Sequence, residues 1–305
     1  MKLVAHLSAY GWPAAAPADR LAAVLGEVAT IADEGGIDGL ATADHLWQHP
    51  LAGGPEAPLL EAYTTLAWLA ARTRTVRLLT VVTGAHFRHP ALLAKTVTSL
   101  DVLSGGRAWL GIGAGHYEEE CTALGVPFPP LAERYELLED ALEVCTRIWA
   151  GGDAPFTGHH VQAERLFGAP RPLQQPGPPI LIAGTGERRT LPLVARYADA
   201  CSLRPSPDIP AKLDVLRRHC DTAGTDFDRI ERTCAFAFDL DDGGPATEKL
   251  LEQLRWLSGL GIAPVIGRLD GDDPRTTAER LVRHVVPEVA GLGRPAGFAS
   301  PVSPG

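Results

Sequence analysis

The sequence of residues 76–115 is VRLLTVVTGAHFRHPALLAKTVTSLDVLSGGRAWLGIGAG, and this stretch decides the fold. Residues 76–83 are apolar and rich in β-branched side chains, which is typical of a buried strand. Pro90 stands where the first turn of a helix accepts proline, and the apolar residues after it recur on one helical stripe. The pair Gly105-Gly106 ends that helix, and residues 107–113 form the next strand. The stretch therefore predicts a strand, a helix and a second, parallel strand.

The same alternation extends along the chain. Strands are predicted at residues 2–8, 38–43, 76–83, 107–113, 179–183, 199–203, 231–240 and 262–268. Helices are predicted at residues 18–35, 60–73, 90–104, 131–149, 191–198, 209–223, 246–258 and 276–289. Eight strand–helix units favour a closed (β/α)8 TIM barrel, and an open doubly wound sheet is the alternative.

One irregular segment interrupts the alternation. Residues 151–178, rich in glycine and proline, are an insertion after the fourth helix, with a hairpin expected near Thr157-Gly158. The sequence thus predicts a single α/β barrel domain over residues 1–290 and a loose C-terminal tail over residues 291–305.

Composition excludes several classes of protein. The chain has 305 residues, of which 45% are hydrophobic and 21% are charged, so it is not disordered. Its net charge of −9 argues against a nucleic-acid partner. No run of about 20 apolar residues and no signal peptide is evident, so we expect a cytoplasmic protein that does not enter a membrane. The five cysteines are dispersed without a CxxC pair, which argues against disulfides and a cysteine zinc site.

Asp44 and His45 end the second predicted strand. Catalytic groups of a barrel lie at the C-terminal ends of the strands, and a carboxylate beside an imidazole can set its tautomer. We therefore expect Asp44 and His45 to be catalytic, with a capping Asp and a surface His as the alternative. His45 and His49 are four residues apart, but Pro50 ends any helix there, so no metal site is predicted.

Two glycine-rich turns end the fourth and fifth strands. They contain Gly113, Ala114 and Gly115, and then Gly184, Thr185 and Gly186, with Arg188 two residues on. Glycines let backbone amides approach a ligand closely, and amides at a helix start beside an arginine suit a phosphate or carboxylate. Plain barrel turns with solvated arginines are the alternative.

Other polar residues near these turns give weaker signals. His116 directly follows the first turn and is a candidate catalytic residue, whereas the acidic run 118–120 is expected to be a solvated helix face. His86 and His89 have no acidic neighbour in sequence and are expected to be structural or at the surface, with a place in the lining of a site as the alternative. The residues by themselves thus predict a barrel enzyme that binds an anionic ligand, and lysines on central strands or a GxSxG motif are absent.

Several further motifs carry a family resemblance. They are residues 80–84 with 87–95 (FRHPALLAK), 100–107 (LDVLSGGR), 125–130 (GVPFPP), 171–174 (RPLQ), 182–189 and 196–200 (RYADA). Together they resemble the bacterial luciferase-like monooxygenase superfamily, and most closely its coenzyme F420-dependent oxidoreductases. The resemblance implies a (β/α)8 barrel with an insertion, a deazaflavin bound in its mouth, and a homodimer.

The resemblance also implies roles for individual residues. His45, beside Asp44, would contact the deazaflavin ring and assist proton transfer. A non-proline cis peptide would join Val81 and Val82, next to Thr83, under the ring. The phosphate-bearing part of the coenzyme would pass the turn at Gly113, Ala114 and Gly115, and the anionic tail would meet Gly184, Thr185, Gly186 and Arg188. His116 is a departure, because many relatives carry tryptophan there and sugar-phosphate dehydrogenases carry an acid.

The expected function is hydride transfer between coenzyme F420 and a small organic substrate with a C=C, C=N or C=O bond. His45 or His116 would donate the proton. One alternative is an FMN-dependent monooxygenase that uses O2, and another is a protein that binds a flavin or deazaflavin without catalysis. Substrate selection is expected from the loops at residues 10–17, 47–58 and 153–177.

Overall fold

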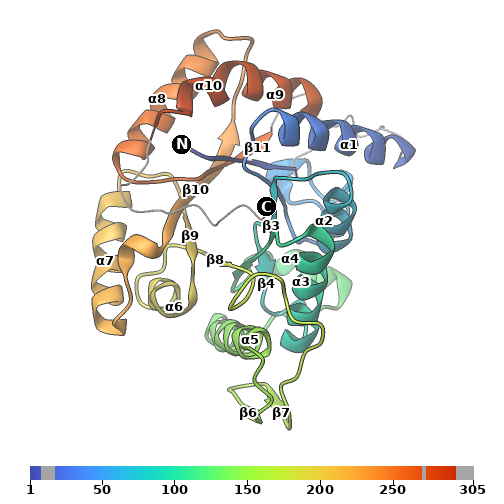
Figure 1. Ribbon diagram of the computed structural model, residues 1–305, viewed down its shortest axis with the longest axis vertical. Coiled ribbons are helices and arrows are strands. Elements are labelled where there is room, and N and C mark those ends of the chain that lie inside the picture. The colour runs from blue at the N-terminus through green and yellow to red at the C-terminus, as the bar shows by residue number, and fades with distance from the viewer. Residues whose placement is uncertain (8–17, 270–272, 293–305) are drawn as a thin grey trace.

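The structure, a computed structural model, describes residues 1–7, 18–269 and 273–292. Its centre is a closed barrel of eight parallel strand positions (Figure 1). The strands are β1 (Leu3–His6), β2 (Gly39–Thr42), β3 (Arg77–Thr80), β4 (Thr83–Gly84), β5 (Ala108–Gly113), β8 (Ile180–Ala183), β9 (Ala200–Leu203), β10 (Glu231–Phe238) and β11 (Val265–Leu269). The sheet runs in the order β3-β2-β1-β11-β10-β9-β8-β5-β4, and pairing of β3 with β5 closes it, so the predicted (β/α)8 barrel is confirmed.

The third barrel strand is divided into β3 and β4. Val81 and Val82 separate the two parts, and the peptide bond between them is cis, as the family resemblance implied. Both parts pair with β5, β3 through Leu78 and Leu79 and β4 through Thr83 and Gly84. A Cβ atom at Gly111 would clash with the carbonyl oxygen of Thr80, so β5 requires glycine where it passes β3.

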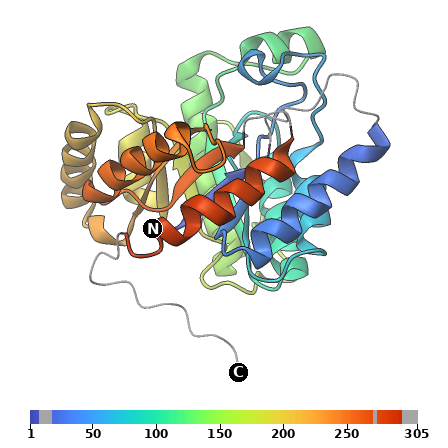
Figure 2. The same cartoon turned by 90° about the horizontal axis from the view of Figure 1, so that it is seen from above.

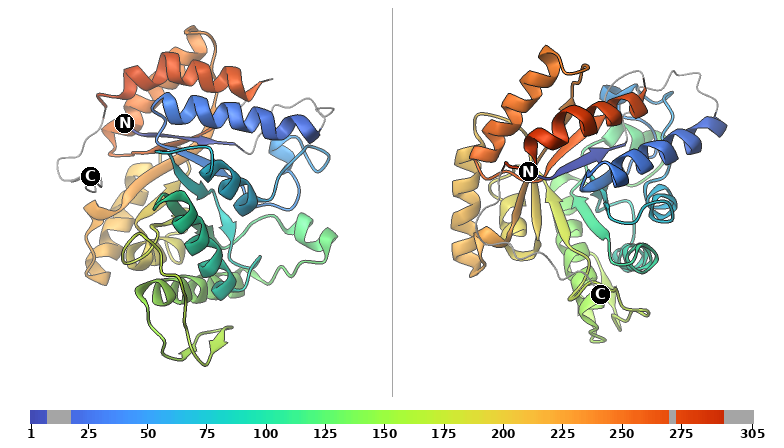
Figure 3. Two further views of the ribbon diagram at one scale, coloured as in Figure 1. Left: turned by 45° about the vertical axis from the view of Figure 1, so that its right-hand side comes forward. Right: turned by 45° about the horizontal axis from the view of Figure 1, so that its top comes forward.

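Helices surround the barrel, and Figures 1 and 3 show α8, α10, α9 and α1 at one end of the long axis and the β6–β7 hairpin at the other. They are α1 (Ala18–Glu34), α2 (Ala62–Ala70), α3 (Pro90–Ser104), α4 (Glu118–Leu124), α5 (Leu131–Ala150), α6 (Thr190–Tyr197), α7 (Ile209–Ala223), α8 (Pro245–Gly259), α9 (Pro274–Arg280) and α10 (Val286–Val289). Short 3-10 turns η1 (Pro50–Ala52) and η2 (Phe227–Arg229) connect elements, and a π-helical segment, η3 (Leu281–Val285), joins α9 to α10. In the view from above α1 and α9 lie side by side (Figure 2). No helix in the described ranges has the length and apolar content needed to cross a membrane.

Local sequence signals account for the ends of α3. Pro90 occupies its first turn, the ring of His89 accepts a hydrogen bond from the amide of Ala91, and Gly105 ends the helix at φ 71°. The helix predicted at 276–289 is instead made of α9, η3 and α10. Pro287 lies in α10 and has no amide hydrogen, so it cannot donate a helical hydrogen bond to a carbonyl one turn earlier. This missing bond explains why the chain forms a wider π-helical turn, η3, just before Pro287.

The insertion contains the expected hairpin, made of β6 (Phe156–Thr157) and β7 (Gln162–Ala163) between α5 and β8. The carboxylate of Asp140 on α5 accepts hydrogen bonds from the backbone amides of His159, His160 and Val161 and so fixes the turn. The C-terminal tail from residue 293 lies outside the described residues.

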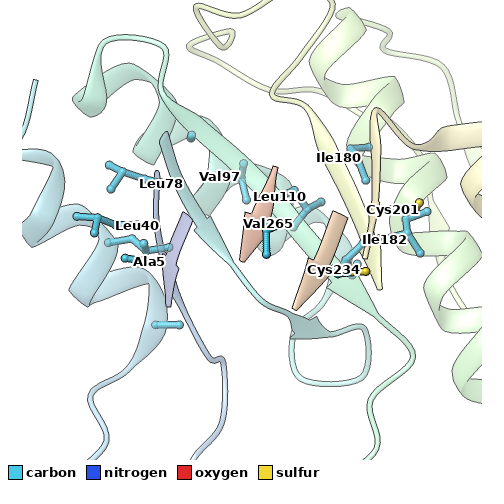
Figure 4. Close-up of a cluster of buried hydrophobic side chains, with 14 of the residues drawn as sticks. Ala5, Leu40, Leu78, Val97, Leu110, Ile180, Ile182, Cys201, Cys234 and Val265 are labelled. Atoms are coloured by element: carbon cyan, nitrogen blue, oxygen red, sulfur yellow. The ribbon is translucent and has the colours of Figure 1, made fainter. Parts of the chain in front are cut away.

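Alternation along the strands divides the core into two layers. Ala5, Leu40, Leu78, Leu110, Ile180, Cys201, Cys234 and Val265 belong to the larger cluster between sheet and helices (Figure 4). Their strand neighbours form a second cluster, inside the barrel, of Val4, Ala41, Leu79, Leu181, Ala200 and Ile266. The five cysteines are all buried and unpaired.

Candidate active site

A cavity of about 600 Å³ opens at the C-terminal ends of the strands. That volume is typical of a site for a cofactor or small molecule. Its walls come from the strand ends and the loops after them: Asp44, His45, Val81, Val82, Gly84, His86, Phe87, Gly113, Ala114, Gly115, His116, Tyr117, Glu120, Leu131, Tyr135, Ala183, Gly184, Thr185, Gly186, Thr190, Ser202, Leu203, Arg204 and Ala235. The ends of strands two to five, which the sequence predicted to converge, therefore meet in one cavity.

Two predicted site residues lie elsewhere. Thr83 is fully buried, and its hydroxyl bonds to the hydroxyls of Tyr63, at 2.7 Å, and Thr80, at 3.2 Å, so it supports the wall without facing the cavity. Arg188 is exposed and is not among the lining residues. The predicted loop at residues 10–17 lies outside the described residues.

The turn after β5 is shaped by its glycines. Gly115 has φ 79°, and a Cβ atom there would collide with the ring of His86. A Cβ atom at Gly113 would lie 3.2 Å from the side chain of Val82. The turn is therefore packed against its neighbours and leaves its open side to the cavity.

The turn after β8 leads into α6. Gly184 has φ 131°, a backbone conformation that L-residues rarely adopt, and its amide bonds to the carbonyl of Ser202. The carbonyl of Gly186 accepts the amide of Leu191 at the start of α6. The hydroxyls of Tyr135 and Thr190 bond to each other at 2.7 Å at this end of the cavity, which thus presents a helix start and hydroxyl groups.

Glu120, and not Asp44, is the carboxylate that contacts His45. Glu120 Oε1 lies 2.7 Å from His45 Nδ1, and Oε2 accepts the amides of Leu46 at 2.9 Å and Trp47 at 3.4 Å. Glu120 is fully buried, although the acidic run that contains it was predicted to be solvated. Burial alone would raise the pKa of Glu120, but the hydrogen bonds from His45 and the two amides lower it, so the group stays anionic.

Asp44 is engaged by an arginine. Its two carboxylate oxygens accept a bidentate pair of hydrogen bonds from Arg88, one of them at 3.0 Å. Arg88 also bonds to Glu61 at 2.8 Å and lies over the ring of Tyr63. The prediction that Asp44 sets the tautomer of His45 is therefore wrong. The guanidinium of Arg88, in the loop before α3, occupies both carboxylate oxygens of Asp44.

Three histidines gather at one end of the cavity. The ring of His116 lies 5.5 Å from that of His45 and 5.6 Å from that of His49, and the ring of Tyr117 lies 4.9 Å from that of His49, tilted by 59°. Desolvation lowers the pKa of His116, and the positive charges of His45, His49 and Arg204 act in the same direction. Desolvation and the charge of His45 likewise lower the pKa of His49. Among the described residues no group of three His, Cys, Asp or Glu side chains is arranged to hold a metal ion.

The ring of His86 packs between Gly84 of β4 and Gly115 in the turn after β5. Its Nε2 lies 3.4 Å from the sulfur of Cys121, and its Nδ1 is buried without a hydrogen-bond partner. Burial lowers the pKa of His86 to about 4, and the charge of Arg134 adds to the effect. His86 is thus a neutral residue of the cavity wall, which fits the structural role and the site-lining alternative but not a surface position.

Arg204, at the end of β9, was not foreseen. It lines the cavity, is exposed, and makes no ion pair within the described part of the chain. Because Asp44 and Glu120 are both already engaged, Arg204 gives this end of the cavity a positive charge that suits an anionic group. The only sequence signal for Arg204 was its position after a predicted strand.

The arrangement combines three chemical elements. Val81 and Val82 form an apolar wall, His45 offers a ring nitrogen held by a buried carboxylate, and Arg204 with the glycine turns suits an anion. These elements fit a flat, partly apolar ligand with an anionic extension and a reaction that moves a proton.

Comparison with known proteins agrees with this geometry. The profile of the luciferase-like monooxygenase family matches residues 6–284. An F420-dependent glucose-6-phosphate dehydrogenase of Gordonia bronchialis is 30% identical over 255 residues, which cover 78% of this chain and 70% of that protein. One of Kineococcus radiotolerans is 31% identical over 249 residues, covering 78% and 69%.

Two solved structures share the fold. The coenzyme F420-dependent tetrahydromethanopterin reductase of Methanopyrus kandleri superposes with a TM-score of 0.77 at 17% identity, covering 94% of this chain and 98% of that one. The monooxygenase RslO1 of Streptomyces bottropensis superposes with a TM-score of 0.76 at 22% identity, covering 94% and 99%. At these identities the likeness concerns the fold alone.

Proposed function

The chain belongs to the luciferase-like monooxygenase family and is an oxidoreductase, and on this premise we propose that it transfers hydride between coenzyme F420 and a small organic substrate. The substrate would carry an activated C=C, C=N or C=O bond. The two named relatives are F420-dependent glucose-6-phosphate dehydrogenases, so they support the coenzyme, whereas glucose 6-phosphate is the substrate of those proteins.

The single observation that carries the proposal is the convergence of Val82, His45 and the two glycine turns on one cavity. When bound, a reduced deazaflavin supplies hydride. The residues present fit such a group, because the apolar wall at Val81 and Val82 suits a flat ring and the turns at Gly115 and Gly184 admit no side chain.

The protein's own residues divide the remaining work. The walls of the cavity orient the substrate against the ring, which is where most of the rate enhancement arises. His45 holds the proton that completes reduction of the substrate. Arg204 and the start of α6 at Thr190 bind anionic groups.

The test is an anaerobic turnover assay. Purified protein is mixed with reduced F420 and a panel of enones, imines and carbonyl compounds, and coenzyme oxidation is followed by absorbance. The proposal expects substrate-dependent oxidation. Turnover only with reduced FMN and O2 would assign a monooxygenase instead, and tight F420 binding without turnover of any substrate would indicate a coenzyme-binding protein.

We also propose that the chain pairs as a homodimer, as its family resemblance implies. Light scattering on the purified protein should give twice the chain mass of 32.4 kDa. A monomeric mass at micromolar concentration would refute this.

A further inference from the structure

We propose that Glu120 is the positioning residue of the reaction: it holds the Nδ1–H of His45, so that His45 Nε2, and not His116, carries the proton. This inference rests on the proposed function for its kinetic readouts. Its structural readout, the tautomer of His45, does not depend on that function.

The contacts of Glu120 fix its carboxylate in place. It receives His45 Nδ1 at 2.7 Å on one oxygen and the amides of Leu46 and Trp47 on the other. A fully buried carboxylate with three donors cannot turn away to solvent. Because an ionised carboxylate only accepts hydrogen bonds, Nδ1 must be the protonated nitrogen.

The other nitrogen of His45 is left for chemistry. Nε2 makes no hydrogen bond within the described residues and is not among the buried unsatisfied atoms, so it remains open to the cavity that His45 lines.

His116 lacks such support. It has no hydrogen-bonded carboxylate among the described residues, and it stands beside His45, His49 and the positive charge of Arg204. Burial and these three charges lower the pKa of His116, and the charge of Glu120 acts in the other direction without reversing the net effect. The titratable and charged groups around His45 are Glu120 on α4, His116 before it, His49 on the loop after β2, and His86 after β4.

The proton balance follows from this geometry. In reduction of a C=X bond the carbon receives hydride from the reduced coenzyme, and X takes the proton from His45 Nε2. His45 is then neutral, with Nδ1–H still bonded to Glu120, and it regains its proton from solvent at the cavity. In the reverse direction Nε2 accepts the substrate's proton.

The test compares Glu120→Gln with Glu119→Gln, a matched control on the same helix. Glu119 is exposed and has no recorded partner in the described structure. The Gln amide can still accept the amide of Leu46, but it would donate to Nδ1 and so move the proton of neutral His45 to Nε2. Nitrogen-15 NMR of labelled histidine reads this tautomer directly.

In its neutral form, we expect His45 to carry its one ring proton on Nδ1 in the wild type and in Glu119→Gln, and on Nε2 in Glu120→Gln. We also expect kcat of Glu120→Gln to fall about 100-fold while its KM changes little, because the substrate still binds but the proton donor is misplaced. Glu119→Gln should stay within about twofold on both measures.

Three outcomes would overturn the proposal. They are an unchanged tautomer in folded Glu120→Gln, an unchanged kcat in that variant, or a wild-type His45 that is protonated on Nε2 alone. If Glu120→Gln does not fold, the wild-type spectrum and Glu120→Asp, which keeps an acceptor and should keep Nδ1–H, decide the question. A wild type that shows the Nδ1–H tautomer but neither binds nor oxidises reduced F420 would refute the proposed function while leaving the role of Glu120 in holding His45 intact.

Discussion

Replacing Asp44 by Asn tests whether this residue stabilises the loop after β2 through Arg88 or instead sets the tautomer of His45. In the structure both oxygens of Asp44 are bonded to Arg88, and the two side chains are 3% and 18% exposed. Removing one partner of a buried pair costs roughly 3–5 kcal/mol. Arg88 is partly exposed and retains Glu61, so we expect the free energy of unfolding to fall by about 2–3 kcal/mol.

The assay is chemical and thermal denaturation. The expected loss corresponds to a drop in Tm of about 3–5 °C for a chain of 305 residues. A double-mutant cycle with Arg88→Met should return a coupling energy of about 2 kcal/mol. NMR should show that His45 keeps its Nδ1–H tautomer in Asp44→Asn, since Glu120 holds it.

Two results would refute this reasoning. A loss below about 0.5 kcal/mol would mean that the Arg88 pair does not anchor the loop after β2. A change of tautomer in Asp44→Asn would return the control of His45 to Asp44.

Three further predictions concern the walls of the cavity. Gly184→Ala should lower the free energy of unfolding by about 1–3 kcal/mol, because φ is 131° at this residue, and the variant should bind the coenzyme more weakly. Gly259→Ala is the control in the same melting assay: no atom lies near the position of its Cβ, so it should lose no stability. The pKa of His86 is lowered to about 4 in the folded protein, so as the pH falls from 6.5 to 4 the unfolded chain takes up a proton at this histidine before the folded protein does. The free energy of unfolding should therefore fall by about 2–3 kcal/mol over that window. A His86→Gln variant whose stability fell just as much over the same window would contradict the lowered pKa of His86. Arg204→Gln should raise the Kd of an anionic coenzyme about tenfold, with a smaller effect at high salt, and an unchanged Kd in a fluorescence titration would exclude Arg204 from the binding site.

The barrel was predictable because its elements carry local signals. Apolar strands alternate with helices along the chain, and glycine or proline marks many of the helix ends. The ends of α3, for example, are determined by Pro90 and Gly105, which are signals in the neighbouring sequence itself. The division between β3 and β4 was visible only through the family resemblance, because nothing in the run of β-branched residues indicates a cis bond at Val81-Val82. The widening of the last helix before Pro287 had a local cause that could have been recognised.

Parts of the site could not be predicted, because partners lie far apart in sequence. His45 and Glu120 are 75 residues apart, and Asp44 and Arg88 are 44 apart. The acidic run 118–120 gave no sign that its last member turns inward, since only packing of α4 against the loop after β2 buries Glu120. Arg188 was expected at the cavity from its neighbours in sequence, but the turn of the chain leaves it in solvent.

The most direct measurement is an equilibrium titration of the wild type and of Ala114→Trp with F420 and with FMN. Ala114 lines the cavity at the turn after β5, so a tryptophan there would fill the space assigned to the coenzyme. We predict that the wild type binds F420 at least about tenfold more tightly than FMN, and that Ala114→Trp loses this binding while remaining folded. Tighter binding of FMN, or undiminished F420 binding by folded Ala114→Trp, would contradict the assignment of this cavity.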